Sequence, residues 1–258
     1  MDPVYRYETQ EFSAPARFLS AWLGIKGPAW AVSTACTSGS KALASASRLI
    51  ELGVCDAVIA GGVDTLCQMT IAGFSSLQVI SEQPCLPFSQ HRQGINIGEA
   101  AAVFLVTAEP GPVKIAGYGE SSDAYHISSP DPEGKGAAKA MMAALKHAQL
   151  KPSDIDYMNL HGTATEQNDA MEALVVNQIL GDQIACSSTK ALTGHTLAAA
   201  GALEALFCWL TLCREDGQLP PHIWDGCHDP SIASLNGLAK RNLERPVNFA
   251  MSNSFAFG

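Results

Sequence analysis

Four side chains able to take part in acyl or proton transfer stand where short apolar runs give way to small residues. Cys36 lies in residues 33–39 (STACTSG), His161 opens residues 161–165 (HGTAT), and Lys190 and His195 lie in residues 187–195 (SSTKALTGH). Helix amides favour the thiolate form of a cysteine placed where a helix begins. Each residue taken alone also fits a structural role, and it is the set of four that favours catalysis.

A thiol with two imidazoles is compatible with two kinds of reaction. Hydrolysis of a thioester by Cys36 and His161 needs a base that activates water and a carboxylate or amide that orients it. Two neutral imidazoles instead suit hydrogen bonding to an enolate oxygen that forms when a carboxylate leaves as carbon dioxide. The helix expected after His195 presents its positive end to that imidazole and disfavours its charged form.

The elements expected to position these residues alternate between short apolar runs and longer runs with helical periodicity. Strands are expected at 30–34, 57–60, 101–106, 113–116, 155–160, 184–187 and 247–251, helices at 37–52, 69–80, 136–150, 168–180 and 196–214, and a loop at 219–230. This alternation predicts an α/β fold with buried, partly parallel sheets. Because turns that follow parallel strands gather at one sheet edge, we expect the motifs to converge on one cleft.

Composition sets further bounds on function. The 258 residues are 47% hydrophobic, which is enough for a substantial core and excludes a disordered or coiled-coil chain. The net charge of -9 is the wrong sign for a general nucleic-acid binder. Eight cysteines without a CxxC pair indicate a reducing compartment. The apolar run 197–212 is short for a membrane span and carries Glu204, so a cytoplasmic protein is expected.

The sequence matches metal-binding and nucleotide-binding motifs only in part. His195, Cys208 and Cys213 share one region, but two cysteines five apart on a helix offer poor tetrahedral geometry for zinc. Residues 117–119 (GYG) are a fragment of a dinucleotide fingerprint with no phosphate loop after them. No metal and no organic cofactor are therefore expected.

Five ordered segments carry a resemblance to a known family. They are VSTACTSG, SSDAYHISSPDPEG, NLHGTAT, SSTKALTGHT and SNSFAFG, and the similarity runs from about Phe12 to Gly258. The chain resembles the β-ketoacyl-[acyl-carrier-protein] synthases, the elongating condensing enzymes of the thiolase superfamily. The resemblance implies a thiolase-like, layered α/β/α/β/α fold. It implies a partial N-terminal half with the nucleophile over residues 1–111 and a C-terminal half with the His/Lys/His set over residues 112–258.

The resemblance also implies roles for single residues. Cys36 would be the nucleophile that accepts the acyl chain, His161 and His195 would hold the malonyl thioester carbonyl, and Lys190 would act electrostatically beside His161. The backbone N–H groups of Cys36 and Phe257 would form the oxyanion hole, and Phe257 would gate the site. The implied substrate-binding residues are Thr163, Thr165, Phe255 and Phe257, and the implied supporting carboxylates are Glu172 and Asp169. In some relatives a monovalent cation lies near positions matching Asn159, Glu204, Ser252 and Asn253, and an ordinary hydrogen-bonded carboxylate is the alternative here.

The implied reaction is a decarboxylative Claisen condensation between an acyl group on Cys36 and a malonyl group on acyl carrier protein, in fatty acid or in polyketide or polyene elongation. The implied partners are acyl- and malonyl-loaded carrier protein and a second subunit, as a homodimer or as a heterodimer with a synthase-like chain. No nucleic acid and no membrane is expected as a partner. The alternatives are a non-catalytic partner resembling a chain-length factor, or an inactive fragment of a synthase.

Some features depart from the family pattern. Only 35 residues precede Cys36, where relatives have a longer stretch, so the expectation is an N-terminally truncated synthase that also lacks its C-terminal end. Ala256 stands where relatives often have Gly, and Ser89 and Gln93 replace acidic residues. Glu166 and Asn168 replace a common Pro and Gly. These departures favour a specialised branch that builds polyketide or polyene chains.

Overall fold

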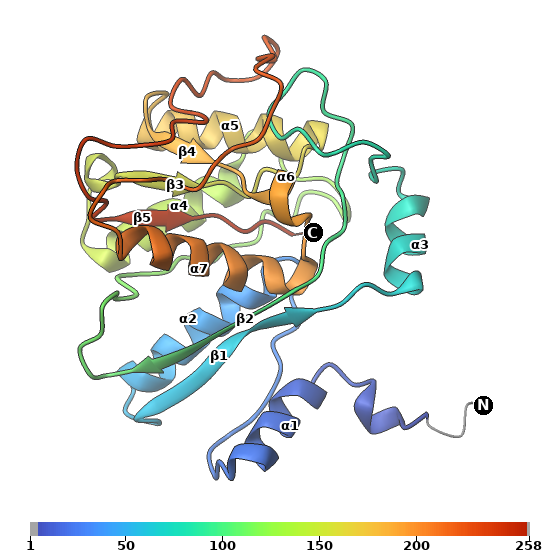
Figure 1. The fold of residues 1–258 in the computed structure, drawn as a ribbon, viewed down its shortest axis with the longest axis vertical. Coiled ribbons are helices and arrows are strands. Elements are labelled where there is room, and N and C mark those ends of the chain that lie inside the picture. Colours follow the sequence, from blue (N-terminus) through green and yellow to red (C-terminus); the bar gives the residue numbers. More distant parts are fainter. Residues whose placement is uncertain (1–4, 257–258) are drawn as a thin grey trace.

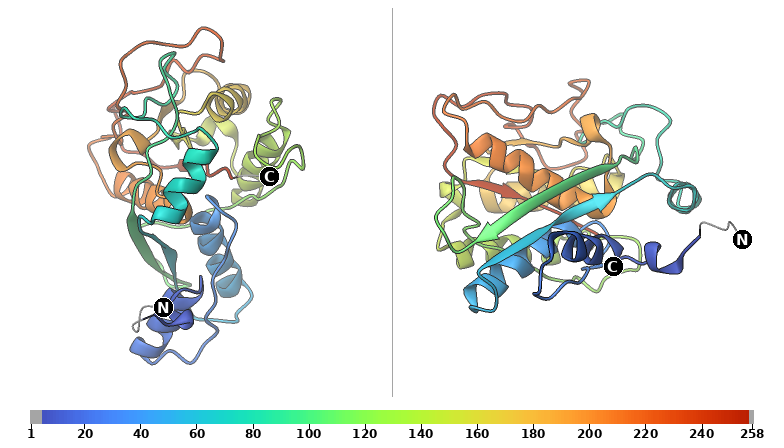
Figure 2. Two further views of the ribbon diagram at one scale, coloured as in Figure 1. Left: turned by 90° about the vertical axis from the view of Figure 1, so that its right-hand side faces the viewer. Right: turned by 60° about the horizontal axis from the view of Figure 1, so that its bottom comes forward.

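The computed structural model describes residues 5–256 of the chain (Figure 1). The α-helices are α1 (Ala14–Leu23), α2 (Ser38–Glu51), α3 (Gln68–Ser76), α4 (Lys135–Ala148), α5 (Glu166–Leu180), α6 (Lys190–Thr193) and α7 (Ala200–Leu212). The strands are β1 (Ala57–Asp64), β2 (Ala100–Thr107), β3 (Tyr157–Asn159), β4 (Ala185–Ser187) and β5 (Ala250–Ser252). Short 3-10 helices lie at Tyr7–Thr9, Pro152–Asp154 and Leu197–Ala199. α1 lies at the lower end of the molecule in Figure 1 and in the left view of Figure 2.

A short parallel sheet of order β4-β3-β5 forms the centre of the main core. Successive side chains of a strand point to opposite faces of the sheet, and the side chains on both faces of β3 are buried. Met158 packs into a cluster with residues of α4 and α5, whereas Tyr157 packs into a second cluster with Cys208 of α7. The sheet is therefore covered by α4 and α5 on one face and by α7 on the other, and buried on both sides as expected for parallel strands.

The second sheet is an antiparallel ribbon of β1 and β2, in which Ala57 pairs with Thr107 and Asp64 with Ala100. Its inner face packs with Leu43 and Ala46 of α2 and with Ala205 of α7. α2 and α7 thus lie between the two sheets, which gives successive layers of helices, sheet, helices and sheet (Figures 1 and 2). The outer face of the ribbon exposes four apolar side chains, namely Ile59, Val63, Val103 and Leu105.

Two glycines set the spacing of the central helices. A Cβ on Gly39 of α2 would lie 2.6 Å from the backbone nitrogen of Ala202, and one on Gly201 of α7 would lie 2.7 Å from that of Ser40. Such distances are shorter than real Cβ contacts allow, so glycine at both positions lets the two backbones meet. This close approach brings the turn that precedes α2, with Cys36, against the segment that leads into α7.

Most elements expected from the sequence are present, and several differ in extent. Residues 30–34 form no strand beyond one bridge between Thr34 and Cys36, and residues 113–116 form no strand. A strand needs a neighbouring strand to satisfy its backbone groups, and neither segment pairs with one among the described residues, which explains both errors. The helix expected at 69–80 ends at Ser76, and the one expected at 196–214 divides into a 3-10 turn and α7. Residues 219–230 are a loop, as expected.

None of the helices between residues 5 and 256 combines the length and the apolar character that crossing a membrane requires.

Candidate active site

Cys36 lies in a tight turn directly before α2. Ala35 has a φ of 52°, in the left-handed region that non-glycine residues seldom adopt. The turn is held by hydrogen bonds from the Thr37 N–H to the Thr34 carbonyl (3.3 Å) and from the Ser38 hydroxyl to the Ala35 carbonyl (2.6 Å). The Cys36 side chain is buried, and the unusual backbone at Ala35 fixes the position from which its thiol enters the site.

Two carboxylates of α5 hold the loop that follows β3. Glu172 accepts hydrogen bonds from the backbone N–H groups of His161 (2.8 Å) and Gly162 (2.7 Å). Asp169 accepts from the N–H groups of Thr163 (3.1 Å) and Ala164 (3.2 Å), and also from that of Phe88 (2.7 Å). Because positions three apart share a helix face, both carboxylates reach the same loop.

Burial raises the pKa of both carboxyl groups. It raises the pKa of Asp169 to about 6 and that of Glu172 to about 7, against the opposing effect of the backbone N–H groups that each accepts. Both groups act through the backbone and fix the place of the His161 imidazole.

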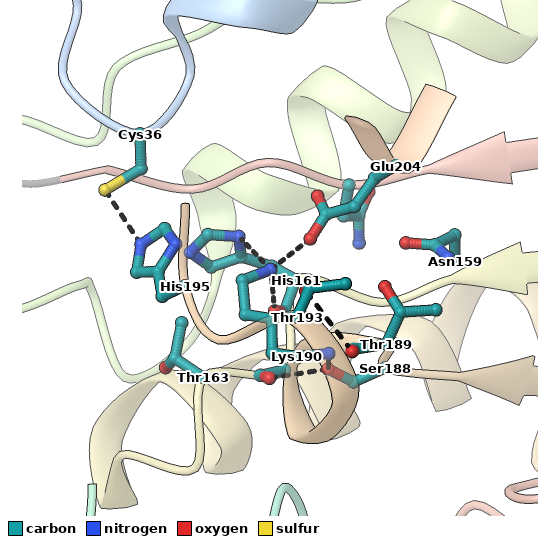
Figure 3. Close-up of polar contacts among 12 residues, drawn as sticks. Cys36, Asn159, His161, Thr163, Ser188, Thr189, Lys190, Thr193, His195 and Glu204 are labelled. Carbon is teal, nitrogen blue, oxygen red and sulfur yellow. Dashed lines mark hydrogen bonds and ion pairs between the residues drawn. The ribbon is translucent and has the colours of Figure 1, made fainter. Parts of the chain in front are cut away.

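Lys190, at the start of α6, is buried between His161 and Glu204 (Figure 3). Its ammonium forms an ion pair with Glu204 and donates to the His161 carbonyl at 2.5 Å, and it lies 3.3 Å from His161 Nδ1. An ammonium only donates, so Nδ1 must be the acceptor and the proton of neutral His161 is on Nε2. Burial, and then the charge of Lys190, hold the pKa of His161 well below its usual value.

His195 faces Cys36. Its Nε2 lies 3.1 Å from the Cys36 sulfur, and its ring meets that of His161 edge to face, with the centroids 5.2 Å apart (Figure 3). The backbone of His195 is clamped by Asn96, whose carbonyl accepts its N–H at 2.6 Å, and by Gly98, whose N–H donates to its carbonyl at 3.0 Å. Burial, followed by the Lys190 charge, holds the pKa of His195 well below its usual value, so both imidazoles are neutral.

The thiol of Cys36 differs from the expectation of a favoured thiolate. Burial raises its pKa to about 11, and the nearby charge of Lys190 and the backbone N–H only partly oppose that effect. Helix amides favour a thiolate, but the removal of water around this sulfur has the larger effect. At neutral pH the resting group is therefore a thiol, with His195 Nε2 within reach of its proton.

The residues implied to bind substrate lie at the edge of this cluster. The hydroxyls of Thr163 and Thr165 are hydrogen-bonded to each other at 2.9 Å, and the Phe255 ring lies edge-on to His161 with centroids 5.8 Å apart. Phe257, implied as the gate and as an oxyanion donor, lies outside the described residues.

The contacts of the two implied carboxylates add detail that the sequence did not supply. Glu172 reaches the His161 loop, but the carboxylate that pairs with Lys190 is Glu204 of α7. The signal for this partner was the single acidic residue within the apolar run 197–212, since a buried carboxylate needs an opposite charge.

Several buried oxygens in this region have no hydrogen-bond partner among the described residues. Among them are Glu204 Oε2 of this pair and Asn159 Oδ1 (Figure 3). Carboxylate and amide oxygens are suitable ligands for a hard cation. Of the four positions that the resemblance links to a monovalent cation, these two therefore fit it, whereas Asn253 uses its amide nitrogen to bond Glu172 and Ser252 is exposed.

A buried histidine that the sequence analysis did not single out joins the loops of the site. His222 Nδ1 accepts the Ser188 N–H at 3.0 Å, and His222 Nε2 donates to the Pro87 carbonyl at 3.2 Å. The Ser188 hydroxyl in turn donates to the Gly162 carbonyl at 2.7 Å. His222 thus helps to fix the relative positions of the loops that carry Lys190 and His161.

We expect His222 to make stability depend on pH. Burial lowers its folded-state pKa to about 4 from 6.5, so between these values the unfolded chain binds more protons and stability falls as the pH falls. The loss contributed by this group is about 3 kcal/mol across that window. Urea denaturation at a series of pH values should show a shallower loss in His222→Gln than in the native chain. Equal slopes for the two proteins would contradict the assignment.

Comparison with known proteins gives consistent results. The family model described as "Beta-ketoacyl synthase, N-terminal domain" matches residues 4–110, and the one described as "Beta-ketoacyl synthase, C-terminal domain" matches residues 113–224. The chain is 36% identical to 3-oxoacyl-[acyl-carrier-protein] synthase 2 of Staphylococcus aureus over 253 residues, which cover 92% of this chain and 62% of that protein. The chain therefore spans somewhat less than two thirds of that relative.

Two solved structures are also similar. A ketosynthase (ApeO) in complex with its chain length factor (ApeC) from Xenorhabdus doucetiae matches with a TM-score of 0.94 and 50% identity, over all of this chain and 64% of that one. The AntDE:AntF structure, a type II PKS acyl-carrier protein in complex with its ketosynthase, matches with a TM-score of 0.88 and 27% identity, over all of this chain and 68% of that one.

Proposed function

This chain belongs to the β-ketoacyl synthase family, and on that premise we propose that it carries the active site of a decarboxylating carbon–carbon bond-forming enzyme. The observation that carries the proposal is the contact between Cys36 Sγ and His195 Nε2, with the His161 ring beside it. The division into residues 1–111 with the nucleophile and residues 112–258 with the His/Lys/His set is part of the proposal, as is a cytoplasmic location.

Acyl loading begins with the thiol of Cys36. Its raised pKa means that it needs a base, and neutral His195 is placed to accept the proton as the sulfur attacks the carbonyl of an incoming thioester. The bond from the acyl carbon to the carrier's sulfur breaks, and the departing carrier thiol takes the proton from His195. The result is an acyl-Cys36 thioester and an imidazole that is neutral again.

Decarboxylation then uses both imidazoles as donors. The carbon–carbon bond to the malonyl carboxylate breaks, carbon dioxide leaves, and the electron pair moves toward the thioester oxygen. The His161 proton is on Nε2 because Lys190 occupies the Nδ1 side, so His161 can donate to that oxygen. His195 accepts at Nε2 during loading, so its ring proton must move from Nδ1 to Nε2 before that atom can act as the second donor. The enolate carbon attacks the acyl carbonyl, and the Cys36 sulfur leaves as a thiolate and takes up one proton from solvent.

The proposed partners are acyl carrier protein and a second, synthase-like subunit. Support comes from the two similar structures, one described as a complex with an acyl-carrier protein and the other as a complex with a chain length factor. A non-catalytic role, resembling a chain-length factor, is disfavoured because the thiol, both imidazoles and the paired lysine are all present and in contact.

The experiment that tests the proposal separates loading from decarboxylation. His161→Ala is expected to leave acyl transfer to Cys36 detectable by mass spectrometry and to reduce release of carbon dioxide from malonyl carrier protein by about 10²- to 10³-fold, the usual cost of losing one oxyanion donor. His195→Ala is expected to reduce both steps. Normal condensation by both variants would refute the proposed roles.

A further inference from the structure

Two surface loops bring three metal-ligating side chains together outside the site described above. They are residues 89–92, between α3 and β2, and residues 225–229, between α7 and β5, and both run along the upper part of Figure 1. A ring nitrogen of His91, a carboxylate oxygen of Asp225 and Cys227 Sγ all lie within 4.8 Å of one another. We propose that these three side chains bind a Zn²⁺ ion, with water as the fourth ligand.

The donor set fits zinc chemically and geometrically. An imidazole nitrogen, a carboxylate oxygen and a thiolate sulfur are the three ligand types that zinc takes from proteins, whereas magnesium and calcium take oxygen ligands. With bonds of about 2.0 to 2.3 Å, the ligand atoms of a tetrahedral zinc site stand about 3.4 to 3.7 Å apart. His91 Nδ1 and Asp225 Oδ2 lie 2.7 Å apart, and no two ligand atoms of the three residues are more than 4.8 Å apart. Small side-chain rotations therefore bring the three atoms to a common distance.

The carboxylate is already oriented for this role. Asp225 Oδ1 accepts the Ser89 hydroxyl at 2.9 Å and the Cys227 N–H at 3.0 Å, which leaves Oδ2 directed at His91. The Ser89 oxygen also accepts the backbone N–H of His91 at 3.0 Å. Ser89 thus fixes both the carboxylate and the imidazole from behind, as the outer hydrogen-bond partners of metal ligands do.

The two loops are joined independently of any ion. The Gln90 N–H donates to the Cys227 carbonyl at 3.0 Å, and Ser89 and His228 form an antiparallel bridge. Gly226 has a φ of 77°, which allows the turn between the two ligands of the second loop. Because the ligands come from loops that are held in register, binding loses little chain entropy.

Charge also favours a dication at this place. Arg92, the cation next to the cluster, is paired with Asp229 at 2.5 Å and so is already neutralised. Binding would release the Cys227 proton to solvent and replace the hydrogen bond from His91 Nδ1 to Asp225, with the ring proton moving to Nε2. The thiolate and the Asp225 carboxylate together would then balance the charge of Zn²⁺. The bound ion would clamp one side of a surface groove of about 860 Å³ that Gln90, Arg92 and Asp229 help to line.

The first test uses Co²⁺ as a spectroscopic probe of the reduced 258-residue chain. We expect an absorption band from thiolate-to-cobalt charge transfer that saturates at one equivalent and disappears when Zn²⁺ is added. Cys227→Ser and His91→Ala should both abolish the band, and Ser89→Ala should weaken cobalt binding by about 10- to 100-fold. Cys213→Ser, which alters an exposed cysteine outside the cluster, should leave the band unchanged.

The second test does not depend on cobalt. Zn²⁺ should slow alkylation of Cys227 by iodoacetamide, measured by peptide mass mapping, by at least about tenfold, while Cys67 and Cys213 react at unchanged rates. In His91→Ala the protection of Cys227 should be lost at the same zinc concentration. A cobalt band that survives Cys227→Ser, or equal alkylation of Cys227 with and without zinc, would overturn the proposed site.

Discussion

Replacing Cys36 with alanine is expected to abolish acyl transfer to the chain and condensation, while some decarboxylation of malonyl carrier protein persists. The reason is that loading requires the sulfur that contacts His195, whereas loss of carbon dioxide requires the imidazoles, which this variant retains. Loss of the nucleophile from an enzyme with a covalent intermediate can lower the turnover rate by about 10⁶-fold. The measurement is peptide-mapped mass spectrometry after mixing the chain with an acyl carrier protein thioester.

A second buried cysteine provides the control for this experiment. Cys208 of α7 has its pKa raised to about 12 by burial and packs in the cluster that contains Tyr157. Cys208→Ala should therefore cost stability but still accept the acyl group on Cys36. An acyl adduct on the Cys36→Ala chain, or condensation at the native rate, would refute the nucleophile assignment.

Replacing Lys190 with methionine is expected to lower the free energy of unfolding by about 3 to 5 kcal/mol, the usual result of leaving one member of a buried ion pair without its partner. Lys190 and Glu204 are 2% and 3% exposed, so water cannot solvate the remaining carboxylate. The variant also removes the donor to the His161 carbonyl and the charge that depresses the pKa of His161. Urea denaturation at constant pH measures the first effect.

A double variant distinguishes the ion pair from general packing. Lys190→Met combined with Glu204→Leu removes both charges and keeps apolar volume, so it should be more stable than Lys190→Met alone. A double variant that is as unstable as the sum of the two single variants would show that the charges do not act on each other. The pKa of His161, followed by NMR, should rise in Lys190→Met because the neighbouring positive charge is gone.

Local pattern was enough to predict how the site assembles. The turns before α2, after β3 and on both sides of α6 combine short apolar runs with small residues, and the structure brings Cys36, His161 and His195 together. The α/β class and the thiolase-like fold implied by the resemblance are confirmed, because both sheets and the central helices are present and similar ketosynthase structures match closely. Of the five layers implied, the described residues form four.

Features that depend on burial were not predictable in the same way. The pairing of Lys190 with Glu204, the bridging role of His222 and the raised pKa of Cys36 each follow from segments that are distant in sequence and exclude water from one place. Local propensity does not report which polar groups will share a buried space. The strand expected at 113–116 failed for a related reason, because a strand requires a partner that only the tertiary fold supplies.

The pairing of Lys190 has a consequence for how the proposed reaction would gain its rate. Its ammonium is neutralised by Glu204, and the two imidazoles are uncharged, so a malonyl carboxylate would gain little attraction on entering. A carboxylate that is bound weakly loses little binding energy when it leaves as carbon dioxide. The His161 proton, in contrast, faces an oxygen on which charge grows only as the bond breaks. The site would therefore bind the transition state more strongly than the malonyl substrate, and this difference would increase the rate.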